Sequence, residues 1–292
     1  MKKYLLIIAI ALLASCSGKN KKSDAYGNFE ADEVIISSEV GGKLLLFTIE
    51  EGSVIDSGKL IGIIDTTDLQ LKKEQLMAQR GAISTKSPNI AAQIEVQQQQ
   101  KNNLLIDKAR IEKLLKDGAA TKKQLDDING SINLMDKQIA SIATQNNSVG
   151  DEILGIDKQI AQINQTIKKS YLVNPIKGTV LDKYMMQDEL VAPGKSLYKI
   201  ADLSYIFLKA YVSESQLAAV KLGQKVEVLI DKGEKEMGKY EGIVTWVSST
   251  AEFTPKIIQT KEERVNLVYA VKIKVKNDGA LKIGMPGEVN FR

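Results

Sequence analysis

The residue types that usually carry chemistry are scarce in this 292-residue chain. It contains no His and a single Cys, at position 16. The absence of His removes His-based catalytic triads, His general bases and His metal ligands. One Cys leaves no disulfide and no Cys-rich metal cluster. These two absences exclude His-based catalysis and metal sites built from His or from several Cys residues.

Cys16 stands at the end of a sequence with the features of a signal peptide. Lys2 and Lys3 precede nine apolar residues, 5–13, a stretch too short to span a bilayer. The segment ends in Leu-Ala-Ser-Cys, which resembles a bacterial lipobox, where the Cys thiol receives diacylglycerol. We expect removal of residues 1–15, with the lipid on Cys16 as the one covalent group and residues 16–28 as lipidated Cys and flexible tether. The alternative is an ordinary signal sequence that happens to contain a Cys.

The balance of charge argues against a nucleic-acid partner. The chain carries 40 basic and 36 acidic residues, a net charge of +4, which gives no electrostatic footprint for nucleic acid. No segment beyond the leader approaches the 18 apolar residues of a spanning helix. Two or three acyl chains suffice to hold a protein on a membrane. We therefore expect membrane attachment through the lipid alone.

A repeat of β-strand and turn signals occurs twice, at residues 42–64 and 178–200, with a constant offset of 136. Each half reads as short strands separated by glycine turns and is too short to bury its own apolar face. The pattern resembles the barrel-sandwich hybrid of lipoyl and biotinyl carrier domains, split into residues 29–66, with a membrane-proximal strand, and 171–203. The expected turn residues are Gly42, Gly52, Gly58, Gly178 and Gly194.

The two halves are separated by a long segment, 67–170, with helical periodicity. From Leu125 the apolar positions step alternately by three and four residues, which predicts a coiled-coil seam with Asn146 as a polar member that fixes the register. Gly118 suits the end of one helix and Thr121 the N-cap of the next, so the tip of a helical hairpin lies near 116–121. Arms of about 50 residues would project roughly 70 Å. Gly81 and Pro88 should interrupt the first arm. The seam includes Ile128, Ile132, Ile139, Ile142, Val149, Ile153 and Ile160.

The lipobox, the split repeat, the hairpin and a β-rich segment at 204–292 together resemble the HlyD-type membrane fusion proteins, or periplasmic adaptor proteins. Residues 251–256, 260–264 and 267–273 resemble, in particular, adaptors of ABC-2-type exporters; the alternative for residues 262–264 is a plain charged loop. The resemblance implies an elongated mixed α and β fold. This fold has a split lipoyl-like barrel-sandwich hybrid with an inserted α-helical coiled-coil hairpin, plus a C-terminal β-barrel and membrane-proximal β region.

The resemblance also implies a docking motif at the hairpin tip. Adaptors that meet TolC-like channels carry an Arg, a Leu four residues later and a Ser seven residues after that. Arg110, Leu114 and Thr121 meet this spacing, with Thr in place of Ser. Arg supplies several donors for carbonyl groups, and an exposed Leu supplies an apolar contact. The alternative is that Leu114 belongs to the seam, Arg110 is a solvated flank and Thr121 only a helix cap.

The implied function is that of an adaptor in a three-part export system, so we expect a protein that is not an enzyme and that holds no metal ion. The expected partners are an inner-membrane transporter, an ABC permease and ATPase or alternatively an RND pump, a TolC-like outer-membrane channel, and further copies of the chain in a hexamer. The protein would lie in the periplasm, lipid-anchored to the inner membrane. A carrier domain is the first alternative, but Lys108 in Asp-Lys-Ala falls in a helical segment and not on a β-hairpin. A purely structural coiled-coil lipoprotein of the envelope is the second.

Overall fold

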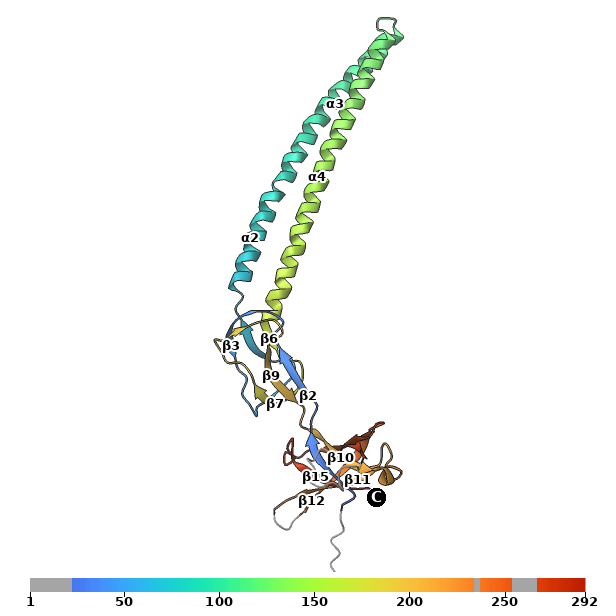
Figure 1. Ribbon diagram of the computed structural model, residues 1–292. Coiled ribbons are helices and arrows are strands. Elements are labelled where there is room, and N and C mark those ends of the chain that lie inside the picture. The colour runs from blue at the N-terminus through green and yellow to red at the C-terminus, as the bar shows by residue number, and fades with distance from the viewer. Residues whose placement is uncertain (1–22, 234–236, 254–266, 292) are drawn as a thin grey trace, which may run out of the picture.

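The computed structural model describes residues 23–233, 237–253 and 267–291. The molecule is elongated, with a β-barrel at one end, a smaller β domain next to it and a helical hairpin that projects from the far side of that domain (Figure 1). The expected signal peptide and Cys16 lie outside the described residues, as does much of the segment 251–273 that resembles the exporter adaptors. Within the described part of the chain, no helix is both long and apolar enough to cross a membrane.

Six strands close the barrel in the order β10-β1-β15-β11-β12-β14, because β14 pairs back onto β10. Buried and outward-facing residues alternate along the strands of its wall. In β10, Ile206, Leu208, Ala210 and Val212 are fully buried, while the residues between them face outward. The short strand β13 adds to the outer side of β14. The bounds are β1 Ala25–Glu30, β10 Tyr205–Ser213, β11 Lys225–Asp231, β12 Met237–Val247, β13 Glu252–Phe253, β14 Leu267–Lys276 and β15 Pro286–Asn290, with the one-turn helix α5 at Glu214–Leu217.

Strand β1 corrects the expectation that the tether extends to residue 28. Residues 25–30 pair with both β10 and β15 and are part of the barrel. The strand is hard to recognise in the sequence because only Ala25 and Phe29 of it are buried. Gly27 stands where a Cβ atom would overlap the carbonyl oxygen of Lys209, so no apolar residue fits there. The barrel therefore contains both the first and the last described strand of the chain.

The smaller β domain consists of two four-stranded sheets, and each sheet takes strands from both sequence halves. One sheet has the order β2-β9-β7-β4 and the other β6-β5-β3-β8. Repeat-equivalent residues occupy equivalent core positions: Leu44 and Val180 are buried, and so are Ile64 and Ile200. The strands are β2 Glu33–Ser37, β3 Gly42–Phe47, β4 Val54–Ile55, β5 Leu60–Ile64, β6 Tyr171–Val173, β7 Gly178–Lys183, β8 Leu190–Val191 and β9 Ser196–Ala201.

The repeat also matches at its turns. Gly52 has a φ of 80°, and its equivalent Asp188 has a φ of 71°, so both adopt the left-handed conformation that their positions require. Positive φ values also occur at Gly42, Gly58 and Gly194. Gly178 differs from the expectation, because it begins strand β7 and lies in no turn. A Cβ atom there would stand 2.6 Å from the carbonyl oxygen of Ala201, so close strand approach is what demands a glycine.

Asn174 joins the two halves at the centre of this domain. It is fully buried, and its Nδ2 donates to the carbonyl oxygens of Asp56, at 3.0 Å, and Ile176, at 2.6 Å. The hydroxyl of Tyr198 donates to its Oδ1 at 2.9 Å. Burial raises the pKa of Tyr198 to about 12, so this donor keeps its proton over the physiological range. One side chain thus satisfies polar groups of both halves in the buried core of the domain.

The hairpin consists of α2 (Thr67–Ser84) and α3 (Lys86–Lys116) in one arm and α4 (Lys122–Ser170) in the other. The first arm is interrupted at Thr85, between Gly81 and Pro88, as the sequence predicts. Pro88 is the third residue of α3, where the missing N–H has no partner within the helix. Asn146 accepts a hydrogen bond from the Ser87 hydroxyl at 2.7 Å, across the seam, which agrees with its expected role in setting the register.

The replacement Asn174→Ala should destabilise the β domain. It leaves the Tyr198 hydroxyl and two carbonyl groups without their partner in a buried site, which costs about 3 kcal/mol of unfolding free energy. Urea unfolding followed by circular dichroism measures this change. The exposed Asn147→Ala serves as the control and should stay within about 0.5 kcal/mol of the unaltered protein. An Asn174→Ala protein as stable as this control would contradict the assignment.

Candidate functional site at the hairpin tip

The tip begins with a closed helix end. Gly118 follows the C-cap Asp117 with a φ of 73°. The Ala119 N–H donates to the carbonyl oxygen of Leu114 at 2.8 Å, and the Gly118 N–H donates to that of Leu115 at 3.2 Å. This pair of bonds is the Schellman arrangement, in which a left-handed residue satisfies the last carbonyl groups of the helix. The expected role of Gly118 as the residue after the helix end is confirmed.

Thr121 opens the second arm through reciprocal capping. The Gln124 N–H donates to Thr121 Oγ1 at 3.3 Å, and the Thr121 N–H donates to Gln124 Oε1 at 2.7 Å. This capping box confirms the expected N-cap. The Thr121 hydroxyl also donates to Gln124 Oε1, at 3.1 Å. Its hydrogen is therefore already engaged, and only acceptor capacity and the methyl group face outward from this position.

Arg110 and Leu114 lie one turn apart on the same side of α3, close to the tip. The Arg110 side chain is 70% exposed, and its Nη1 lies 3.3 Å from Asp107 Oδ1. An exposed pair of this kind is weak, so the guanidinium group retains donors for another acceptor. Leu114 is 40% exposed, whereas its neighbours Ile111 and Leu115 turn toward the seam. The hairpin itself therefore does not require an apolar residue at position 114.

The coiled-coil seam packs the two arms of the hairpin together between the tip and the β domain. Every predicted seam position of α4 is half-buried or buried against the first arm, whereas most positions between them are exposed. The well-packed part is near the base, where Leu76, Ile83 and Ile90 meet Val149 and Ile156. The residues so placed are Ile128, Ile132, Ile139, Ile142, Val149, Ile153 and Ile160.

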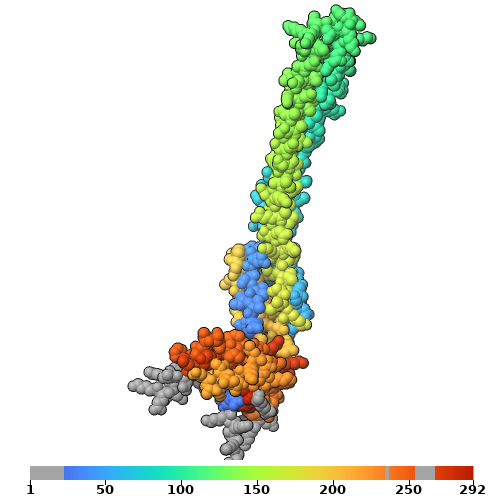
Figure 2. Space-filling view, turned by 90° about the vertical axis from the view of Figure 1, so that its right-hand side faces the viewer, coloured from blue at the N-terminus to red at the C-terminus, as the bar shows by residue number. Residues whose placement is uncertain are grey.

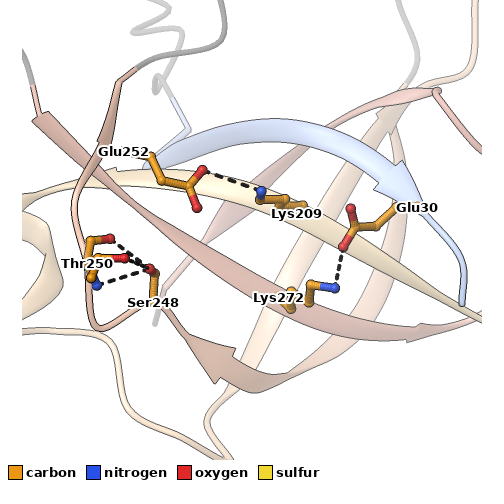
Figure 3. A network of polar contacts seen from close by, with 6 residues as sticks. All are labelled: Glu30, Lys209, Ser248, Thr250, Glu252 and Lys272. Atoms are coloured by element: carbon orange, nitrogen blue, oxygen red, sulfur yellow. Dashed lines mark hydrogen bonds and ion pairs between the residues drawn. The ribbon is translucent and has the colours of Figure 1, made fainter.

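A second group of polar residues, which the sequence did not single out, lies on the barrel wall (Figure 3). Lys209 of β10 and Lys272 of β14 are register partners, and two like charges at such positions repel each other. Each has its own carboxylate: Glu252 of β13 lies 3.4 Å from Lys209, and Glu30 of β1 lies 2.7 Å from Lys272. These charges neutralise one another and connect four strands, so the group stabilises the barrel wall and offers no free charge to a ligand.

The turn beside this group is also fixed by hydrogen bonds. The Ser248 hydroxyl donates to the Thr250 carbonyl oxygen at 2.7 Å, and the Thr250 N–H donates back to Ser248 Oγ at 3.2 Å (Figure 3). The turn leads into β13, where Phe253 is 78% exposed and pairs with Leu267, also exposed. Both apolar side chains therefore lie exposed at the outer edge of the sheet. The neighbouring residues 254–266 lie outside the described part of the chain.

The described residues offer no site for a metal ion. No group of three or more Asp, Glu or Cys side chains within them could hold a metal ion. The tip presents an exposed guanidinium donor and an exposed leucine, and the barrel edge presents exposed apolar side chains.

Comparisons with known proteins agree with this architecture. The chain is 25% identical, over an alignment of 341 residues, to a UPF0194 membrane protein of Citrobacter koseri, covering 100% of this chain and 98% of the relative. A UPF0194 membrane protein of Acidithiobacillus ferridurans is 24% identical, covering 97% of this chain and 91% of the relative. No family model matches the chain.

Two solved structures share the fold. MacA from Actinobacillus actinomycetemcomitans superposes with a TM-score of 0.58 at 21% identity, covering 91% of this chain and 76% of that one. The membrane fusion protein Spr0693 from Streptococcus pneumoniae gives 0.55 at 15% identity, covering 91% and 97%. The expected fold class is thereby confirmed. The chain is a homologue of the UPF0194 membrane proteins and has the fold of the membrane fusion proteins.

Proposed function

We propose that this chain is the periplasmic adaptor of a three-part export system, in which it links an inner-membrane transporter to a TolC-like outer-membrane channel. The observation that carries the proposal is the hairpin tip, where Arg110 and Leu114 are exposed on a rigid helix at the end of the molecule farthest from the barrel (Figure 1). The exposure of these two side chains does not stabilise the hairpin. A partner that supplies carbonyl groups and an apolar surface would satisfy both residues.

The opposite end suits a contact at the inner membrane. The barrel contains β1, so a lipid on Cys16 would hold this end close to the bilayer through the short segment before Ala25. The exposed pair of Phe253 and Leu267 lies on the same domain and would face the transporter. The solved relative Spr0693 is described as a membrane fusion protein, which supports the same role. The chain would act by bridging and sealing the conduit, with no bond made or broken.

The sequence favours an ABC-type transporter as the inner-membrane partner, through the resemblance of residues 251–273 to the exporter adaptors. The RND pump is the alternative partner. Affinity purification from detergent-solubilised native membranes, followed by mass spectrometry, tests the proposal. Recovery of an ATP-binding subunit with its permease and an outer-membrane channel is the expected result. Recovery of an RND pump would change the partner, and recovery of no transporter would overturn the adaptor role.

The replacement Arg110→Asp should weaken channel contact. It removes charge-assisted hydrogen bonds worth about 1.5–3 kcal/mol, so co-purification of the channel and export should fall about 10- to 100-fold. The protein should remain folded and membrane-bound, because the Arg110 side chain is largely exposed. Lys158→Asp, an equal change of charge at an exposed site of α4 near the base, is the control. Unchanged export in the Arg110→Asp strain would refute the tip assignment.

The replacement Cys16→Ser should release the protein from the membrane, because no acyl chain can then be attached. Fractionation of washed membranes and the soluble periplasm, followed by immunoblotting, measures the distribution. Ser17→Ala changes the next residue without removing the thiol and should leave the protein on the membrane. A Cys16→Ser protein that stays on washed membranes at the unaltered level would exclude lipid as the main anchor.

A further inference from the structure

The outer wall of the barrel carries a groove with a volume of about 530 Å³, which crosses the neighbouring strands β10, β1, β15 and β11. Alternation along these strands turns most of its lining side chains away from the barrel core. Figure 2 shows the smaller β domain and the hairpin above one end of the barrel and not around its wall. Register pairing sets Tyr211, Tyr26, Glu288 and Leu229 in one row across the groove, with Asn28 and Pro286 in the next row and Asp231 at the end of β11.

Two tyrosine side chains contribute aromatic rings to the groove. Tyr26 and Tyr211 are register partners on β1 and β10, and Tyr26 is 51% exposed. The face of an aromatic ring attracts cations. Tyr211 already has such a contact, because Lys209 Nζ lies 5.6 Å from the centroid of its ring. Among the described residues, no cation lies over the Tyr26 ring. The groove therefore contains an exposed ring that has room for a cation from outside.

Two acidic residues of the groove, Glu288 and Asp231, differ from the other carboxylates of the barrel strands. The others each form an ion pair with a lysine; they are Glu30, Glu227, Glu241 and Glu252. Within the described residues, Glu288 and Asp231 form no ion pair. The Ser23 hydroxyl donates to Glu288 Oε2 at 2.5 Å, which orients this carboxylate and leaves Oε1 available. Because both acids lie on the same face of adjacent strands, a cation between them would relieve their mutual repulsion.

We infer that this groove binds an organic cation, a molecule in which an ammonium group is joined to an apolar portion and no anionic group is present. The ammonium group would lie between the Glu288 and Asp231 carboxylates and the face of the Tyr26 ring. Leu229 and Pro286 supply apolar surface for the rest of the molecule. An anionic group on the ligand would meet the same carboxylates and be repelled. This inference goes beyond the proposed function and does not depend on it, because binding here needs neither transporter nor channel.

Equilibrium dialysis of the full chain in detergent, with empty micelles as the blank, measures binding of the probe benzyltrimethylammonium. The unaltered chain should bind the probe saturably. The Kd should rise at least tenfold in Glu288→Gln and in Tyr26→Ala, because each replacement removes one contact with the cation. Benzyl alcohol keeps the aromatic ring of the probe without its charge and should bind at least tenfold more weakly than the probe.

Two matched control variants lie outside the groove. Glu241→Gln removes an exposed carboxylate of the same barrel that already pairs with Lys225. Tyr184→Ala removes a tyrosine of the smaller β domain that is 41% exposed. Both should keep the Kd within twofold of the unaltered chain, and circular dichroism should show every variant folded. An unaltered chain without saturable binding, or an unchanged Kd in Glu288→Gln, would overturn the inference.

The same assay tests two other sources of ammonium groups. Lys21 and Lys22 precede Ser23 in the sequence. A Lys21→Gln/Lys22→Gln chain that binds the probe at least tenfold more tightly would show that the chain's own lysines fill the groove, and an external ligand would be refuted. Displacement of the probe by an equal concentration of O-phosphoethanolamine would identify a lipid headgroup and refute the inference as well. We expect the double variant to bind within twofold of the unaltered chain and phosphoethanolamine not to compete, because the two carboxylates repel its phosphate.

Discussion

The structure depends on one constraint: neither half of the split repeat can bury its own apolar face. The halves must therefore pair with each other across a separation of about 100 residues, as the mixed composition of both sheets shows. The pairing of β5 with β6 matters most, because β5 leads into α2 and α4 leads into β6. These two paired strands hold the start of α2 next to the end of α4. The β domain therefore sets the direction of the hairpin and brings its two arms together at the base.

The seam then continues outward from this domain, and its apolar side chains are less deeply buried toward the tip. Near the base, Ile83 and Ile156 belong to a packed cluster, and Arg80 forms an ion pair with Asp157 across the arms. Closer to the tip, an ion pair between Lys101 of α3 and Asp136 of α4 also joins the two arms. An exposed ion pair is worth less than a buried apolar contact. The end that is proposed to dock is therefore the part of the hairpin held together least by its own core.

Much of this was predictable, because the relevant signals are periodic or local. The 136-residue offset predicted the equivalent core positions of Leu44 and Val180, and the three–four spacing predicted the seam of α4. Gly118 and Thr121 gave the tip from the requirements of a helix end and a helix start. Gly178 looked like a turn because a glycine in a strand and one in a turn are identical in sequence, and only the nearby Ala201 carbonyl group distinguishes them.

The sequence did not predict the features that arise from pairing between segments far apart in the chain. Strand β1 has few apolar residues, and its place in the barrel follows from its neighbours β10 and β15, which lie far along the chain. The same pairing has a mechanical consequence. The barrel is covalently joined to the lipoyl-like domain only through residues 31–32 and 202–204, two short connections that lie side by side because β2 pairs with β9. A movement imposed on the barrel would therefore be passed to the lipoyl-like domain and the hairpin through these two paired connections.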